Sequence, residues 1–346
     1  MRGQKISSAC HAKILCCGRA PSMVAISRRG LVTGAGLLAS QHITPPTTAA
    51  LPPTAAVAVL PQPGRLVAVG DIHGDATAFR SVLSLAGLFD ETSGWIGGDT
   101  VLVQIGDVLD RGDDEYDCIQ LLRRLKGEAR MAGGAVVTML GNHEVLNAAG
   151  VTAYASPLSA ERWNARATTD RATAFLAGGE LAADLATWPV ACVVGDTAFC
   201  HAGLTLAQAS RGLEAGNREA AAWLLGRSGS SLLPPQTLWP QTPGAPKSPL
   251  WMRDLSSPPM TEPSAAACKE TSQALALLGA KRLVVGHTVQ PGGINYACDA
   301  SIYRIDVGLS SAMGGGVPQA LEIGRDGSVK TLVARAKSRP VRAAMT

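Results

Sequence analysis

Five short polar motifs, each placed directly after an apolar and β-branched run, constrain the fold of this chain more than any other feature. The motifs are GDIHGD at Gly70, GDVLDRG at Gly106, GNHE at Gly141, HAGL at His201 and GHT at Gly286. The runs RLVAV, TVLVQI, AVVTML and LVV are typical of strands buried on both faces of a parallel sheet. Loops that leave the carboxyl ends of such strands gather at one edge of the sheet. We therefore expect the five motifs to form the floor of a single site.

The spacing of the first three motifs predicts two βαβ units in tandem. Asp71 and Asp107 are 36 residues apart, and Asp107 and Asn142 are 35 residues apart. Both spacings are close to the roughly 30 or more residues of one such unit. We expect the two crossover helices at 75–88 and 114–131, the second with an apolar stripe on one face.

The rest of the chain predicts an α/β fold, a four-layer α/β/β/α sandwich with a βαβαβ core and a helical insertion. The insertion is expected at the alanine-rich residues 145–185, over the site. Residues 228–263, dense in proline and serine, predict a long ordered loop or a moving flap. Short strands are expected at 190–194 and 198–200, and strands of a second sheet at 282–285, 301–305, 319–323 and 328–332. The domain is expected to cover 61–335, with a tail at 336–346.

The first sixty residues differ in composition from the rest. They contain six basic residues and no Asp or Glu, and they are rich in Ser, Ala and Cys. This composition is typical of an organellar transit peptide, so we place residues 1–60 outside the fold as a targeting leader. Within it, Arg28 and Arg29 precede a short apolar stretch at 31–39, which is similar to a twin-arginine lumenal signal. A disordered leader with a chance arginine pair is the alternative.

Charge and hydropathy argue against two kinds of partner. The net charge of the chain is +4, so the part after the leader carries a charge of about −2. We therefore expect no nucleic-acid partner. No apolar stretch reaches the about 20 residues of a transmembrane helix, so we expect no integral membrane segment.

The cysteines predict no metal framework, because those after the leader lack the CxxC spacing of thiolate metal sites. We interpret most of them as buried core thiols, although Cys200 directly precedes His201 and could make the site sensitive to oxidation. The five cysteines are Cys118, Cys192, Cys200, Cys268 and Cys298.

The residue types of the motifs point to two metal ions. Asp71 and His73, two residues apart, suit joint ligation of one ion. Asp107 has two carboxylate oxygens and can bridge both ions, while Asn142, His201 and His287 suit the second. A donor set of oxygen and nitrogen without thiolate fits Mn, Fe or Zn. Two cations about 3.5–4 Å apart can lower the pKa of a bridging water and stabilise charge on a phosphoryl group. Hydrolysis of a phosphate ester by direct attack of this bridging water, as hydroxide, is the chemistry expected of such a centre.

Further polar residues complete that chemistry. His143 is placed to protonate the leaving oxygen, and Asp110 is the candidate partner that holds it as imidazolium. The guanidinium groups of Arg111 and Arg253 are candidates to bind phosphate oxygens, each as a fork of two parallel hydrogen bonds, and Asn142 is a further candidate phosphate contact. Alternatively, Arg253 is a surface residue stacked on the neighbouring tryptophan. Asp306 is a candidate site residue by its position in the sequence, although a turn-forming role before Gly308 is the simpler interpretation.

These motifs resemble those of the phosphoprotein phosphatase branch of the metallophosphoesterases. RLVAVGDIHGD, GGAVVTMLGNHE, the LWMR segment and IDVGLSSAMGG resemble in particular the Shewanella-like phosphatases of chloroplast type. The resemblance covers about residues 64–332. It implies a calcineurin-like sandwich, two divalent ions (Mn, or Fe or Zn), a phosphoprotein substrate and a chloroplast location, in the stroma or the thylakoid lumen. It also implies the roles given above for Asp71, His73, Asp107, Asn142, His143, Asp110, His201, His287, Arg111 and Arg253.

Other functions remain open at this stage. A diadenosine-polyphosphate or small-phosphate hydrolase would use the same metal motifs, and a scaffold that binds phosphate without turnover would keep them too. His143 argues against the scaffold, because binding alone needs no acid. Many metallophosphoesterase nucleases and diesterases carry GHxH, whereas Val289 stands at the second His position here, which argues against a diesterase. The motifs do not distinguish phosphoserine, phosphothreonine and phosphotyrosine, nor do they predict an oligomeric state.

Overall fold

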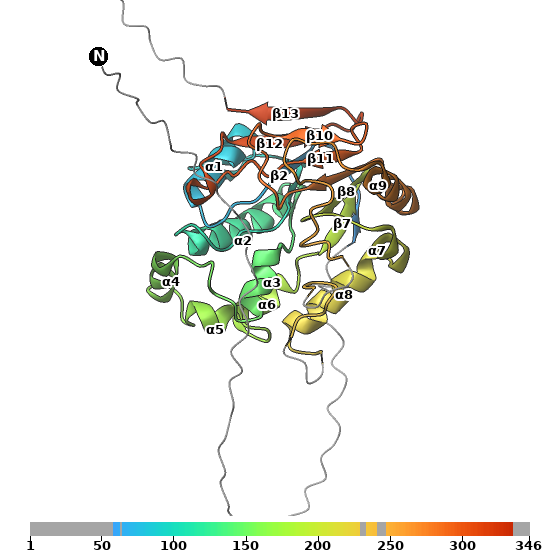
Figure 1. The fold of residues 1–346 in the computed structure, drawn as a ribbon. Helices are drawn as coiled ribbons and strands as arrows, with labels where there is room; N and C mark the ends of the chain where they lie inside the picture. The colour runs from blue at the N-terminus through green and yellow to red at the C-terminus, as the bar shows by residue number, and fades with distance from the viewer. Residues whose placement is uncertain (1–57, 63, 229–232, 241–246, 335–346) are drawn as a thin grey trace, which may run out of the picture. The chain divides into compact units, whose positions relative to one another are not determined.

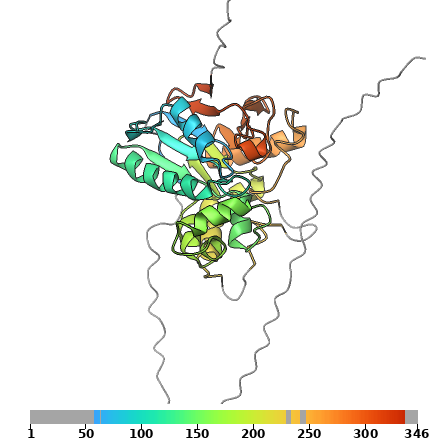
Figure 2. The ribbon, with the colours of Figure 1, turned by 90° about the vertical axis from the view of Figure 1, so that its left-hand side faces the viewer.

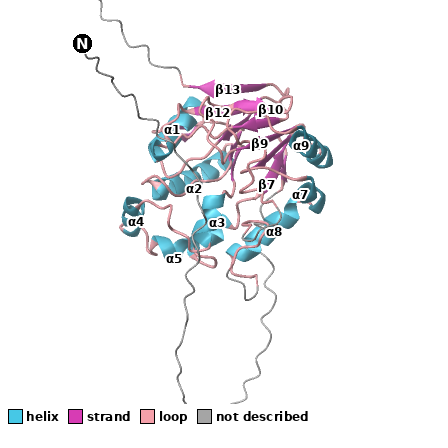
Figure 3. Ribbon diagram, in the orientation of Figure 1, coloured by secondary structure: helices cyan, strands magenta, loops and turns pink. Residues whose placement is uncertain are grey.

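The computed structural model describes residues 58–62, 64–228, 233–240 and 247–334. Two sheets lie face to face in this part of the chain, with helices on their outer faces (Figures 1 and 3). The first fifty-seven residues of the expected leader, and the expected tail at 336–346, lie outside the described residues.

The first sheet contains the predicted βαβαβ core. Three of its strands are parallel and lie in the order β2 (Leu66–Val69), β5 (Val101–Gln104) and β6 (Ala135–Thr138), with β6 at one edge. The expectation for the chain's last two strands was wrong, because β12 (Gln319–Ile323) and β13 (Val329–Val333) belong to this first sheet. β12 pairs antiparallel with β2, and β13 pairs antiparallel with β12. Local periodicity predicts that a segment is a strand but not which sheet edge it joins.

The second sheet contains the other strands that carry motifs. Its order is β1 (Val59–Leu60), β7 (Ala191–Val194), β8 (Thr197–Cys200), β9 (Arg282–Val285), β11 (Ile302–Arg304) and β10 (Asn295–Ala297). β8, β9 and β11 are parallel to one another. β1, at the end of the expected leader, pairs with β7, so residues 59 and 60 are part of the sheet. A small hairpin, β3 (Phe89–Asp90) and β4 (Gly94–Trp95), connects α1 to β5.

Alternating side chains explain the four layers. In β2, Leu66 and Ala68 pack between the sheets with Phe199 and Val284, whereas Val67 and its alternate neighbours pack under the helices. Such alternation follows from the two-residue period of a strand. The helices α1 (Ala76–Leu85) and α2 (Glu115–Met131) cover the first sheet, and α7 (Leu206–Arg211) and α9 (Ala265–Leu278) cover the second. The predicted four-layer α/β/β/α sandwich is confirmed.

The alanine-rich insertion is helical, as expected. It contains α3 (Asn142–Ala148), α4 (Pro157–Asn164), α5 (Arg171–Phe175) and α6 (Glu180–Leu185), drawn in green in Figure 2. α8 (Leu213–Leu224) packs beside α6. The predicted long loop is confirmed for the described residues between α8 and α9, which form turns but no helix or strand. No described helix is long and apolar enough to cross a membrane.

Two of the five cysteines after the leader form a disulfide, which was not predicted from the sequence. Cys268, near the start of α9, forms a disulfide with Cys298 in the turn between β10 and β11. The two lie 30 residues apart in sequence, and only the packing of α9 brings them together. In the described part of the chain, Cys118, Cys192 and Cys200 are free and buried, as expected of core thiols.

Candidate active site and metal centre

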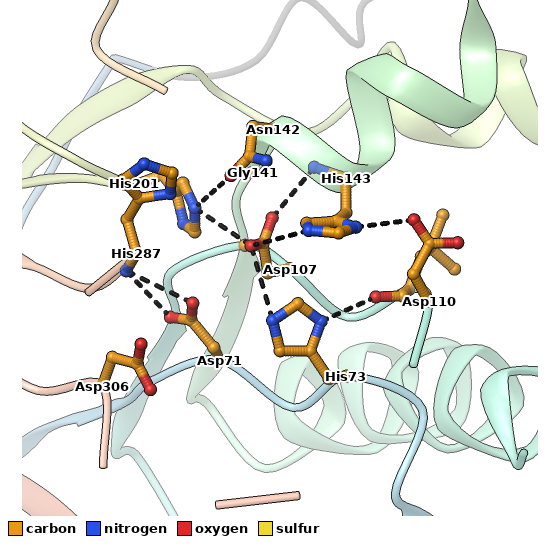
Figure 4. A network of polar contacts seen from close by, with 12 residues as sticks. Asp71, His73, Asp107, Asp110, Gly141, Asn142, His143, His201, His287 and Asp306 are labelled. Atoms are coloured by element: carbon orange, nitrogen blue, oxygen red, sulfur yellow. Dashed lines mark hydrogen bonds and ion pairs between the residues drawn. The ribbon is translucent and has the colours of Figure 1, made fainter. Parts of the chain in front are cut away.

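The five motifs come together where strands of both sheets end (Figure 4). β2, β5 and β6 of the first sheet lead to Asp71, Asp107 and Asn142, and β8 and β9 of the second lead to His201 and His287. The single site expected from the sequence is thus built by the two sheets together.

Glycines let the motif loops approach one another closely. A Cβ atom at Gly286 would collide with the Asp71 carboxylate, and one at Gly141 would collide with the carboxylate of Asp107. Asp107 has a positive φ of 53° and His287 one of 66°, a conformation that costs about 1–3 kcal/mol for residues other than glycine. The motifs therefore contain glycine where a side chain has no room, and the packed loops hold the ligands in a strained backbone.

Asp107 is the centre of the cluster. Its Oδ2 lies 3.3 Å from His201 Nε2, 3.7 Å from His73 Nε2 and 4.0 Å from His143 Nε2. His201 Nε2 is also 3.0 Å from Asn142 Oδ1. Asp107 Oδ2 thus faces His73 of the first predicted metal position and His201 of the second, as a bridging ligand would.

The imidazoles are oriented for metal binding. His73 Nδ1 lies 3.0 Å from the carbonyl oxygen of Leu109, and His201 Nδ1 lies 2.9 Å from that of Ile105. With Nδ1–H donating to a carbonyl, each Nε2 faces Asp107 with the ring nitrogen that would bind a metal ion. His287 Nε2 is buried and has no hydrogen-bond partner within the described residues, a state that a bound cation would relieve.

The electrostatics of the cluster also favour added positive charge. Burial, together with the neighbouring Asp306, raises the pKa of Asp71 well above its usual range. Burial lowers the pKa of His201, but Asp107 and Asp71 outweigh this effect and raise it to about 10. Metal ions would replace such protons as the compensating charge. A carboxylate oxygen of Asp107 lies within 4.8 Å of ring nitrogens of His73 and His143, and also of His201 and His287, so the cluster can hold divalent ions.

The predicted acid pair is present. His143 Nδ1 lies 2.6 Å from Asp110 Oδ2, and the His143 backbone N–H donates to Asp107 Oδ1 at 3.0 Å. Burial lowers the pKa of His143, but Asp107 and Asp110 raise it above its ordinary value. The Asp110 carboxylate thus favours the protonated form of the imidazole, which is the form a proton donor requires.

The two candidate phosphate forks line the same pocket as the cluster. Arg253 Nη1 donates to Thr288 Oγ1 at 2.8 Å and to the carbonyl oxygen of His287 at 3.3 Å. Arg111 lies over the ring of Tyr154, with Cζ 4.7 Å from the ring centre. Both arginine side chains are exposed, and both line the pocket.

Asp306 combines the two roles considered for it. Its Oδ1 accepts the Gly308 N–H at 2.8 Å, as in the expected turn. Its carboxylate also lines the pocket beside Asp71, where burial raises its pKa to about 6. Asp306 therefore both stabilises the turn before Gly308 and lines the pocket.

Some residues of the site were not assigned from the sequence. Glu144 accepts the backbone N–H groups of Gly141, Asp107, Val108 and Leu109 at 2.7–3.2 Å and fixes the Asp107 loop. It stands three residues after Gly141, the N-cap of α3, and a Glu at this spacing reaches back to the N-cap N–H, a signal that could have indicated this role. The Tyr154 ring packs edge-to-face against His143 with ring centres 5.2 Å apart, and no sequence pattern marks it. The buried indole N–H of Trp251, which has no partner within the described residues, also lines the pocket.

Comparison with known proteins identifies the family. Residues 64–291 match the family model described as calcineurin-like phosphoesterase. The chain belongs to the calcineurin-like phosphoesterases. This phosphoesterase is similar to Shewanella-like protein phosphatase 2 of Arabidopsis thaliana, with 33% identity over 310 residues, 78% of the chain and 77% of the relative. The resemblance to the Shewanella-like phosphatases is thereby confirmed.

Two further matches are informative. A symmetrical bis(5'-nucleosyl)-tetraphosphatase of Aromatoleum aromaticum is 30% identical over 193 residues, 55% of this chain and 60% of that protein. A cold-active protein-tyrosine phosphatase of a psychrophilic Shewanella species shares the fold, with a TM-score of 0.64, 22% identity and coverage of 81% of this chain and 84% of that chain. The phosphoesterase is a metal-dependent phosphatase, as expected from its motifs.

Proposed function

We propose that this phosphatase acts on phosphoproteins and uses two Mn ions, or Fe or Zn, within a chloroplast. The observation that carries the proposal is the pocket in which a carboxylate surrounded by imidazoles, a buried His–Asp pair and two exposed arginines face the same space. This arrangement supplies separate groups for the phosphoryl oxygens and for the leaving oxygen of a monoester.

The residues present fit two metal ions. Asp71, His73 and Asp107 would hold the first, and Asp107, Asn142, His201 and His287 the second. When bound, such ions polarise the phosphoryl group and activate a water molecule for attack.

The protein's own groups divide the remaining tasks. Arg111 and Arg253 bind and orient phosphate oxygens through bidentate hydrogen bonds. Asn142, beside His201, is a further contact for phosphate. His143 donates a proton from Nε2 to the leaving oxygen, because its Nδ1 is already bonded to Asp110.

The substrate class is tested by comparing phosphomonoesters with nucleotides. Purified protein supplied with Mn²⁺ is assayed on phosphoserine, phosphothreonine and phosphotyrosine peptides and on diadenosine tetraphosphate at equal concentrations. We expect a higher kcat/KM on at least one phosphopeptide. A preference for diadenosine tetraphosphate would favour the nucleotide hydrolase, and no turnover of any substrate would favour the phosphate-binding scaffold.

The chloroplast location rests on the leader. Its six basic residues and absence of acidic residues support a transit peptide. Fusion of residues 1–60 to a fluorescent protein is expected to direct it to chloroplasts. Replacement of Arg28 and Arg29 by lysine distinguishes the lumen from the stroma, since only a twin-arginine signal depends on that pair. A fusion protein that stays outside chloroplasts would contradict the location.

A further inference from the structure

A buried arginine of the helical insertion contacts the carboxylate that holds His143. We propose that Arg171 is a positioning residue for proton donation: it fixes Asp110, and Asp110 in turn fixes His143. The inference rests on the proposed role of His143 as proton donor. Arg171 does not line the pocket, so it would act only through Asp110.

Both oxygens of Asp110 are engaged. Oδ2 accepts from His143 Nδ1 at 2.6 Å, and Oδ1 accepts from Asn147 Nδ2 and from Arg171 Nη2, each at 3.1 Å. A carboxylate held at both oxygens cannot rotate away from the imidazole without losing bonds on its far side. The orientation of the His143 ring therefore depends on groups that never meet the substrate.

Arg171 is itself held from three sides. Its Nε and Nη2 donate to the two oxygens of Glu115 at 2.7 and 2.6 Å, and its Nη1 donates to Asn147 Oδ1 at 2.8 Å. Glu115 also accepts the backbone N–H of Asp110 at 2.6 Å, and the Ser159 hydroxyl donates to Glu115. The guanidinium fork therefore joins α5 to the start of α2 and to the loop that carries Asp110.

Burial makes these contacts strong. Asp110 and Glu115 are fully buried, and Arg171 is 3% exposed. Removal of one member of a buried ion pair leaves an uncompensated charge and is strongly destabilising. Arg171 lies between the two carboxylates, and Asp110 contacts the His143 imidazole with its other oxygen.

A purely structural role is the competing explanation, because the same contacts tie the insertion to α2. The two roles differ in their dependence on the leaving group. A poor leaving group needs a proton during bond cleavage, whereas p-nitrophenolate leaves without one. Misplacing His143 therefore slows the poor substrate more, while general loosening of the site slows both alike.

The test compares Arg171→Met with Arg166→Met in the full-length protein. Arg166 lies in the same insertion but forms an exposed ion pair with Asp117, which makes it a matched control. Activity is measured on p-nitrophenyl phosphate and on phenyl phosphate, with Mn content and thermal unfolding measured in parallel. We expect Arg171→Met to reduce kcat/KM for phenyl phosphate about 10-fold more than for p-nitrophenyl phosphate, since proton transfer contributes about 10²–10⁴-fold in all. Arg166→Met should change both by the same small factor.

Two additional variants complete the experiment. Arg171→Lys keeps the positive charge but loses the paired N–H groups of the guanidinium. It replaces Arg171→Met in the comparison if the methionine variant does not fold. An equal loss on both substrates in a folded Arg171 variant would overturn the inference. His143→Asn tests the proposed role of His143 itself. If it slows both substrates equally, that role fails, and the inference about Arg171 fails with it. If His143→Asn slows phenyl phosphate more than p-nitrophenyl phosphate but the Arg171 variants do not, only the role of Arg171 fails.

Discussion

At the residue scale, the site depends on a few side chains that face one another across short distances. Asp107 contacts donor groups with both carboxylate oxygens, and Glu144 fixes the loop that carries it. The candidate Asp and His ligands could be predicted because each follows a strand directly in sequence. The support from Arg171 and Tyr154 could not, because it depends on how the insertion packs.

Replacing the central carboxylate tests its bridging role. Asp107→Asn keeps the size of the side chain but removes the charge shared by both metal positions. We expect kcat to fall by about 10²-fold or more and bound metal to fall below two ions per chain, with an unchanged circular dichroism spectrum. Turnover close to that of the wild type would refute the bridging role.

The buried thiols should not react in the folded protein. Burial raises the pKa of Cys200 and of Cys192, so little thiolate forms at neutral pH and access is blocked. Peptide mapping after iodoacetamide treatment should find Cys118, Cys192 and Cys200 unmodified without denaturant and modified with it. Rapid native labelling of Cys200 with loss of activity would instead indicate an oxidation-sensitive site.

At the element scale, loops that follow strands of both sheets carry the residues of the site. Strand periodicity gave correct positions for β9 and β12, since 282–285 and 319–323 match the observed bounds. It could not assign β12 to the first sheet, because antiparallel pairing with β2 is a long-range contact. The disulfide of α9 was missed for the same reason.

That disulfide should contribute to stability rather than to catalysis. It closes a loop of 30 residues, which corresponds to about 3–4 kcal/mol in the chain-entropy description. Cys268→Ser should therefore lower the Tm in denaturation experiments while kcat at 25 °C stays the same, because neither cysteine lines the pocket. Cys298→Ser is the control and should give the same loss. A selective fall in kcat in both variants would contradict this assignment.

At the scale of the whole molecule, the ligands come from both sheets, so bound metal would hold the two layers together. Without such a cation, burial and the neighbouring Asp306 disfavour the charged form of Asp71. The four-layer architecture could be predicted from motif spacing and the runs between motifs. The way in which the two sheets meet at the site depends on how they pack in the assembled fold.

Metal removal should therefore lower the stability of the whole protein. A ligand that binds only the folded state stabilises it by about 2.7 kcal/mol at a concentration 100 times its Kd. Chelation with EDTA should lower the Tm, and added Mn²⁺ should restore it. The Tm of Asp107→Asn should differ much less between EDTA and Mn²⁺. A wild-type Tm that is the same with and without metal would contradict the expectation.

The most direct test of the account is to locate metal in active crystals by anomalous diffraction at the Mn absorption edge. We predict two peaks, one among Asp71, His73 and Asp107 and the other among Asp107, Asn142, His201 and His287. A single peak, or peaks away from Asp107, in crystals that hydrolyse p-nitrophenyl phosphate would contradict the two-metal account.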